Sequence, residues 1–167
     1  MAKRSTSNSA LRSRAAGERE TLWPPGFAAW IKVGVFYQKS SRYLAALLRP
    51  LDLTVAQFDA LANLYVGDGI TQQELAEHLL VTKGNVTGLV NRLSDRGLVT
   101  RKCHPADRRA NAVFLTSRGQ ALAKQALEVQ RRVVDDTIGV LSRADRERLR
   151  ELMDLVVTQV EAKLADG

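Results

Sequence analysis

Residues 70–97 read ITQQELAEHLLVTKGNVTGLVNRLSDRG, and this stretch decides the fold. Thr71 is followed three residues later by Glu74, the spacing of a capping box at which a helix begins. The same device recurs more weakly at Thr82, because Asn85 is shorter than Glu or Gln. The pattern predicts two short helices joined by a tight turn, which is a helix-turn-helix.

The second of these helices, predicted over residues 82–96, has two unlike faces. Its apolar face has the spacing i, i+3, i+4 and i+7 and consists of Val86, Leu89, Val90 and Leu93. The opposite face carries short polar groups, two glycines and one cation, which suit close approach to base edges in a major groove. The predicted DNA contacts on this face are Thr82, Lys83, Gly84, Asn85, Thr87, Gly88 and Asn91. The alternative is a solvated helix face.

The flanking segments extend the prediction to a mainly α fold with a small β-hairpin. Helical spacing is expected from Phe27 to about Arg49, and Thr54 with Gln57 caps a helix over 54–66. Two short strands, Val99–Cys103 and Asn111–Leu115, follow Gly97 and form a predicted wing over 99–115. From Ser117 to Leu164 the chain is helical again, with Ser142 capping the last helix.

Four segments follow from this order. The expected organisation is a basic, disordered arm at 1–25, an N-terminal dimerisation helix at 26–50, a winged helix-turn-helix DNA-binding lobe at 51–116 and C-terminal dimerisation helices at 117–164. The arm is either a simple tail or a segment that contacts DNA or wraps a partner. Two apolar stripes in 117–164 exceed what a compact lobe needs, so a second copy of the chain is expected to cover them.

Positive charge is concentrated where DNA would lie. The chain has 25 Lys and Arg against 18 Asp and Glu, a net charge of +7. Between Pro50 and Val81 there are five acidic residues and no Lys or Arg, whereas Thr82 to Arg109 holds seven basic residues and two acidic ones. This distribution favours a nucleic-acid partner. The predicted wing contacts are Arg101, Arg108 and Arg109, with Asp107 orienting a neighbouring arginine.

Other classes of function find little support. The two histidines, His78 and His104, lack neighbours arranged for catalysis or metal binding, so we expect no enzyme, cofactor or metal site. The single cysteine, Cys103, excludes an intramolecular disulfide but leaves a redox-responsive regulator as an alternative. No apolar run approaches the ~20 residues of a membrane span and no secretory signal is present, which predicts a cytoplasmic protein.

The motifs together resemble the MarR family of bacterial regulators. The resemblance is carried by Leu75-Ala76, by Val90-x-Arg92-Leu93 with Gly97-Leu98-Val99, and by Asp107-Arg108-Arg109 followed after five residues by Leu115-Thr116. It implies a homodimer with intertwined terminal helices that reads an inverted-repeat operator as a repressor. The second short helix would lie in the major groove and the wing tip in the minor groove. Arg109 matches the wing arginine, and Asp107 matches its supporting acid.

The resemblance also implies release from DNA by a small aromatic or anionic effector. Trp30, Tyr37 and Phe58 are the expected apolar walls of the ligand pocket, and Asp59 and Arg92 are its expected polar groups, joined by a salt bridge when empty. A sequence-independent architectural DNA-binding protein is the remaining alternative. Binding to random and palindromic duplexes distinguishes it from an operator-specific reader.

Overall fold

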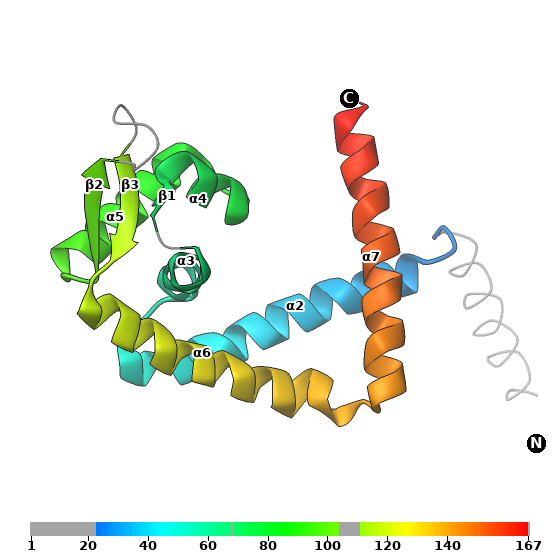
Figure 1. The fold of residues 1–167 in the computed structure, drawn as a ribbon. Coiled ribbons are helices and arrows are strands. Elements are labelled where there is room, and N and C mark those ends of the chain that lie inside the picture. The colour runs from blue at the N-terminus through cyan, green and yellow to red at the C-terminus, as the bar shows by residue number, and fades with distance from the viewer. Residues whose placement is uncertain (1–22, 68, 104–110, 167) are drawn as a thin grey trace, which may run out of the picture. The chain divides into compact units, whose positions relative to one another are not determined.

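The computed structural model describes residues 23–67, 69–103 and 111–166 (Figure 1). In chain order the elements are α2 (Phe27–Leu48), η1 (Arg49–Leu51), α3 (Val55–Val66), β1 (Ile70–Thr71), α4 (Gln72–His78), α5 (Lys83–Asp95), β2 (Val99–Cys103), β3 (Asn111–Leu115), α6 (Ser117–Thr137), η2 (Ile138–Val140) and α7 (Arg143–Ala165). The predicted mainly α fold with a β-hairpin wing is confirmed. Among these helices none is long and apolar enough to cross a lipid bilayer.

Local capping chemistry sets where the helices begin. Thr54 and Thr71 each form a complete capping box, with Gln57 and Glu74 as the reciprocal partners. Thr82 accepts a hydrogen bond only from the backbone of Asn85, at 3.4 Å, as its shorter partner predicts. The helix starts expected from these threonines are therefore confirmed.

The chain forms two units, which are described separately: residues up to 39 and residues 40–166. In the first, the rings of Trp23 and Phe27 stack with centroids 4.2 Å apart, and Phe27 and Trp30 follow at 5.9 Å. The apolar side chains of this part of α2 are exposed, with Trp30 and Tyr37 at 70% and 71%. This segment presents an uncovered apolar surface.

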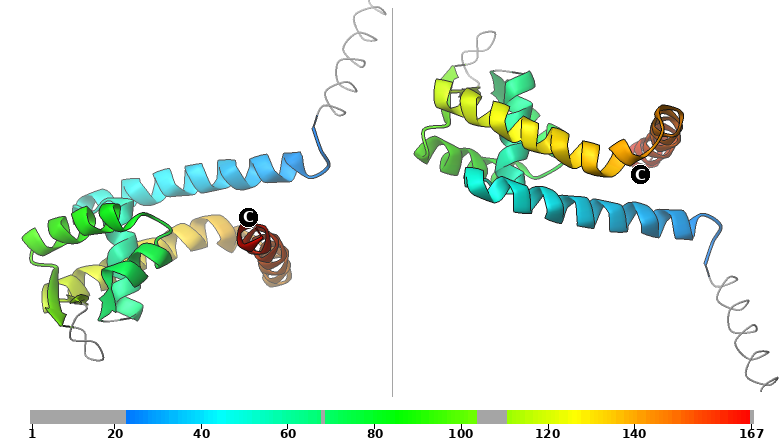
Figure 2. Two further views of the ribbon diagram at one scale, coloured as in Figure 1. Left: turned by 90° about the horizontal axis from the view of Figure 1, so that it is seen from above. Right: turned by 90° about the horizontal axis from the view of Figure 1, so that it is seen from below.

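In the second unit α3 is the central helix. It packs against α4, α5, α6 and β3 (Figures 1 and 2). The core around it is aliphatic apart from one aromatic ring and includes Leu48, Leu53, Phe58, Leu61, Leu64, Leu75, Val86, Val90, Leu93, Leu98 and Val113. Leu53 and Phe58, which flank the Thr54 cap, are both members of this core.

A three-stranded antiparallel sheet in the order β1-β3-β2 completes the lobe. The two strands of the hairpin have the predicted bounds, and they pair Val99 with Leu115 and Cys103 with Asn111. Strand β1 was not expected, because two residues leave no periodic pattern in a sequence. It pairs Ile70 with Val113 on the outer side of β3.

The apolar stripe of α6 is partly covered within its own chain. Ala126 is fully buried and Val133 is 6% exposed, whereas Val140, just after the helix, is 78% exposed. Helix α6 packs against α3, and its role in a dimer stays a prediction. Helix α7 has no buried residue, and Leu155 and Leu164 are exposed at 68% and 77%.

A hydrogen bond joins the last part of α2 to α6. The Tyr43 hydroxyl donates to Asp136 Oδ2 at 2.6 Å, and Arg132 lies 3.6 Å from the same oxygen. The hydrogen bond to Asp136 raises the pKa of Tyr43, because ionisation would place a phenolate beside a carboxylate. This contact connects the two helices at the base of the lobe.

Candidate nucleic-acid interface

The turn between α4 and α5 is tight and contains a leucine in an unusual conformation. Leu80 has φ 53°, in the left-handed region, and its side chain is 92% exposed. Backbone bonds close the turn on both sides, from Leu80 N to the Glu77 carbonyl at 3.1 Å and from Val81 N to the Ala76 carbonyl at 3.0 Å. The turn delivers Thr82 to the N-cap of α5.

Helix α5 has one fully buried face and one open face. Val86, Val90 and Leu93 are at 0% exposure and Leu89 is at 5%, as the apolar spacing predicted. The predicted contact residues Thr82, Lys83, Gly84, Asn85, Thr87 and Asn91 are exposed, and Gly88 is half-buried. The structure therefore brings these polar positions together on one surface, the open face of α5.

The two glycines on the open face serve no packing need within the chain. A Cβ atom at Gly84 would meet nothing within 4 Å, and one at Gly88 would meet only Arg92 Nη1 at 3.7 Å. Glycine inside a helix costs about 1 kcal/mol relative to alanine. Their position on the open face fits a surface that another molecule approaches closely.

Two side-chain contacts on this surface were not predicted from the sequence. Thr87 Oγ1 lies 3.1 Å from Gln72 Oε1, which links α5 to the first turn of α4. Arg101, on β2, donates a hydrogen bond from its guanidinium to Asn91 Oδ1 on α5. Both join residues of different elements, so spacing along the chain gave no signal for either.

The wing is described only in part. Arg101 and Lys102 are exposed on β2, and the Lys102 ammonium lies 5.5 Å from the centre of the Phe114 ring. Asp107, Arg108 and Arg109 lie outside the described residues, as does His104. The side chain of Cys103, on which the redox alternative depends, is also outside the described part.

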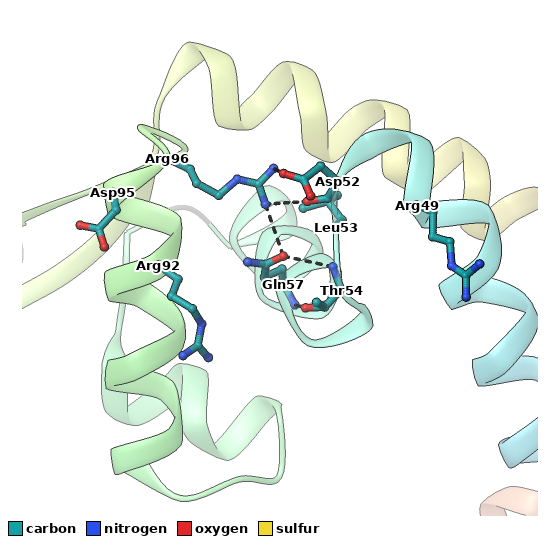
Figure 3. Close-up of a pocket in the computed structure, with 8 residues that line it drawn as sticks. All are labelled: Arg49, Asp52, Leu53, Thr54, Gln57, Arg92, Asp95 and Arg96. Atoms are coloured by element: carbon teal, nitrogen blue, oxygen red, sulfur yellow. Dashed lines mark hydrogen bonds and ion pairs between the residues drawn. The ribbon is translucent and has the colours of Figure 1, made fainter.

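The C-terminal end of α5 is tied to the junction of α2 and α3 by Arg96 (Figure 3). Arg96 Nη1 donates to the Asp52 carbonyl oxygen at 2.7 Å and to Gln57 Oε1 at 3.3 Å, and Nη2 lies 3.2 Å from Asp52 Oδ2. Asp52 has φ 51°, which turns its carbonyl and carboxylate toward the same guanidinium. We call these three residues the Arg96 anchor.

The expected ligand-pocket residues are placed differently from the prediction. Phe58 is 1% exposed in the core, so it is not available as a pocket wall. Asp59 and Arg92 do line one cavity, of about 290 Å³, together with aliphatic side chains of α3, α5 and the turn. Among the described residues no ion pair joins them, and burial alone raises the pKa of Asp59. At this end of α5 it is Arg96, not Arg92, that pairs with an aspartate, Asp52.

Trp30 and Tyr37, the other two expected walls, lie in the first unit and are described by themselves. They line a shallow cavity on the surface of α2 together with Ile31, Val33 and Gln38. They remain predicted pocket residues.

Comparisons with known proteins agree with this architecture. The sequence model of the MarR family matches residues 51–110. An uncharacterized HTH-type transcriptional regulator of Bacillus cereus is 32% identical over 142 residues, which are 83% of this chain and 92% of the relative. The fold is similar to the crystal structure of wild-type MarR from E. coli in its apo form, with TM-score 0.66, 31% identity and coverage of 80% of this chain and 97% of that one.

A crystal structure of a mutant E. coli MarR complexed with operator DNA is also similar, with TM-score 0.68, 32% identity and coverage of 74% of this chain and 89% of that one. This chain therefore has the same fold as these regulators over most of its own length and most of theirs. The chain belongs to the MarR family of helix-turn-helix transcriptional regulators.

Proposed function

We propose that this protein is a cytoplasmic homodimeric repressor that reads an inverted-repeat operator. Helix α5 enters the major groove and the wing at 99–115 enters the minor groove. The observation that carries the proposal is the open face of α5, where exposed polar side chains and two glycines stand opposite a fully buried apolar face. The similar MarR mutant in complex with operator DNA supports it.

The chemistry of this face suits base reading as well as phosphate binding. Asn85 and Asn91 have amide groups that hydrogen-bond base edges, and Lys83 supplies charge at the first turn of α5. Arg101 adds a cation on the adjacent strand. Arg108 and Arg109 at the wing tip, supported by Asp107, are the proposed minor-groove contacts.

Dimerisation is proposed to involve residues 26–50 and 117–164, and the exposed apolar face of α7 is its main support. Along α7, Leu152, Val156 and Val160 are exposed at 44%, 57% and 54%, with no buried residue anywhere in the helix. An apolar face of this length needs a partner in water, and most oligomers of a single chain are symmetric. A two-fold dimer reads half-sites centred about one helical turn, ~10 bp, apart.

The test of DNA reading is selection of bound duplexes from a random pool, repeated with variants. Asn85→Ala should change base preference, because the exposed amide is lost while its backbone cap bond remains. Arg109→Ala should weaken binding by about 1–3 kcal/mol without altering the fold. The control is Arg118→Gln, which removes one positive charge at an exposed position of α6. It should leave base preference and DNA affinity unchanged.

A selected pool without dyad symmetry would instead indicate the architectural DNA-binding protein, and binding insensitive to salt would contradict the proposed phosphate contacts. The dimer is tested separately by light scattering. Val156→Glu should dissociate it to a species near 18.4 kDa, whereas Glu151→Gln on the same helix should not. A wild-type monomer at micromolar concentration would exclude the proposed dimer.

Release by a small aromatic or anionic effector is part of the proposal. Its polar groups are Asp59 and Arg92, which line one cavity with residues of α3 and α5. Trp30 and Tyr37, on α2, stay predicted aromatic contacts of the effector. A gel-shift assay with phenolic and aromatic acids tests it. Equal release of wild type and Arg92→Gln, at matched DNA affinity, would exclude a role for Arg92.

A further inference from the structure

The turn between α4 and α5 (Figure 1) has a leucine at a position where glycine is the usual residue. The backbone N–H of Val81 donates to the Ala76 carbonyl oxygen at 3.0 Å. That of Leu80 donates to the Glu77 carbonyl oxygen at 3.1 Å. These two bonds form the Schellman arrangement at the end of a helix, which holds Leu80 in the left-handed region at φ 53°. A glycine would avoid the close approach of Cβ to the following carbonyl oxygen.

The side chain of Leu80 does not serve the packing of the lobe. It is 92% exposed, the highest value for a large apolar side chain in the described parts of the chain. A single exposed leucine needs no explanation by itself, but a leucine in a strained backbone conformation does. Folding alone would favour glycine at this position, so we looked for a partner outside the chain.

The surroundings of Leu80 point to DNA as that partner. Leu80 borders an open groove of about 780 Å³ at the start of α5. Three of the proposed DNA contacts, Thr82, Lys83 and Asn85, line the same groove. In helix-turn-helix proteins the N-terminal residues of the second helix meet base edges. A side chain two residues before the N-cap of α5 therefore adjoins the bases that this helix would read.

The charged groups of the groove favour a base over a phosphate as the partner of Leu80. On α4, Glu77 also lines the groove, and its Oε1 accepts a hydrogen bond from Gln73 Nε2 at 2.9 Å. A carboxylate repels phosphate oxygens, which disfavours the DNA backbone on this side. Lys83, the cation among the described lining residues, lies on α5 instead. An apolar side chain in a major groove contacts the C5 methyl group of thymine.

We propose that Leu80 reads thymine in the operator by van der Waals contact with this methyl group. Among the four DNA bases only thymine presents a methyl group in the major groove, so the contact is specific. The left-handed backbone is the cost of directing an apolar side chain out of the turn. The inference rests on the proposed entry of α5 into the major groove and adds one base contact to it.

The test uses a duplex that the full-length wild-type protein enriches from a random pool. Each thymine is replaced in turn by deoxyuridine, which removes the methyl group and keeps the base pair. At one position in each half-site the replacement should weaken wild-type binding about fourfold, as expected for one methyl group. In Leu80→Ala the same replacement should change Kd by less than about twofold, because a double-mutant cycle detects a contact only where both partners are present.

Two further variants separate base reading from a structural role. Leu80→Gly should raise the urea midpoint, because glycine adopts the left-handed conformation without strain, and should also lose the methyl effect. A merely structural leucine would lower the midpoint when replaced by glycine, and that result would overturn the proposal. The matched control is Val66→Ala, which shortens an 88% exposed apolar side chain on α3, outside the groove. It should retain the methyl effect.

The binding data can overturn the proposal in three ways. Equal methyl effects in wild type and Leu80→Ala, or no methyl-sensitive position in wild type, would exclude the contact and leave the proposed entry of α5 intact. Weaker binding by Leu80→Ala that is the same for thymine and deoxyuridine duplexes would assign Leu80 to the deoxyribose backbone. A pool with no enriched sequence would overturn base reading together with the proposed function.

Discussion

Removing the Arg96 side chain should destabilise the lobe by about 3–4.5 kcal/mol. Arg96→Ala deletes two hydrogen bonds from a charged donor, each worth roughly 1.5–3 kcal/mol, with the longer one to Gln57 nearer the lower end. The ion pair adds little, because the Asp52 side chain is 95% exposed and such pairs contribute about 0–1 kcal/mol. Most of the effect therefore comes from the carbonyl of Asp52 and from Gln57.

The assay is urea unfolding at one fixed protein concentration, because coupling to dimerisation would otherwise shift the midpoint. Asp52→Asn is the matched variant: it removes the charge, keeps the backbone carbonyl, and tolerates the left-handed conformation. It should cost no more than about 0.5 kcal/mol. If Asp52→Asn lowers the free energy of unfolding as much as Arg96→Ala, the exposed ion pair supplies most of the stabilisation, and the reasoning from the hydrogen bonds is refuted.

Four further predictions concern stability. Gly119→Ala should destabilise the protein strongly, because its Cβ would lie 2.0 Å from a backbone oxygen. Gly88→Ala should instead stabilise the protein by about 0.5–1 kcal/mol yet weaken duplex binding. Urea titrations measure the stability of each variant, and gel shifts measure duplex binding. Burial raises the pKa of Asp59, so this carboxyl lowers the free energy of unfolding as pH rises through that pKa. Asp59→Asn should therefore stabilise the protein at pH 7. The stabilisation should vanish below pH 3.8, the ordinary pKa of the group. The pKa of Tyr43 is raised, so its hydrogen bond to Asp136 stabilises fully below pH 10.0, the ordinary pKa, and is lost above the raised value. The loss of unfolding free energy caused by Tyr43→Phe should therefore become smaller in alkali. Equal losses at pH 8 and above pH 10 would contradict this.

Element boundaries could be predicted where local chemistry decides them. Thr54, Thr71 and Thr82 begin helices because their hydroxyls satisfy backbone N–H groups three residues away, a relation contained in the sequence itself. The buried face of α5 followed from helical spacing in the same way. These features needed no knowledge of how distant segments pack.

Features that depend on distant segments were missed or misassigned. Arg92 and Arg96 are one turn apart on α5, and only the position of the α2–α3 junction decides which of them meets an aspartate. Similarly, an apolar stripe on α6 has the same spacing whether its own chain or a second chain covers it; Ala123 and Ala126 are buried within this chain. Strand β1 exists only because β3 lies beside it.

The hydrogen bond between Arg101 and Asn91 bears on the proposed reading of bases by the open face of α5. An asparagine reads adenine by accepting a proton from N6 with its oxygen while donating to N7 with its nitrogen. Here the oxygen of Asn91 already accepts a hydrogen bond from the guanidinium of Arg101, which leaves its N–H groups for another acceptor. If Asn91 faces a base as proposed, this arrangement should favour the two acceptors of guanine, O6 and N7, over the mixed donor and acceptor edge of adenine. A residue of β2 would thereby set the base preference of a helix that precedes it in the chain.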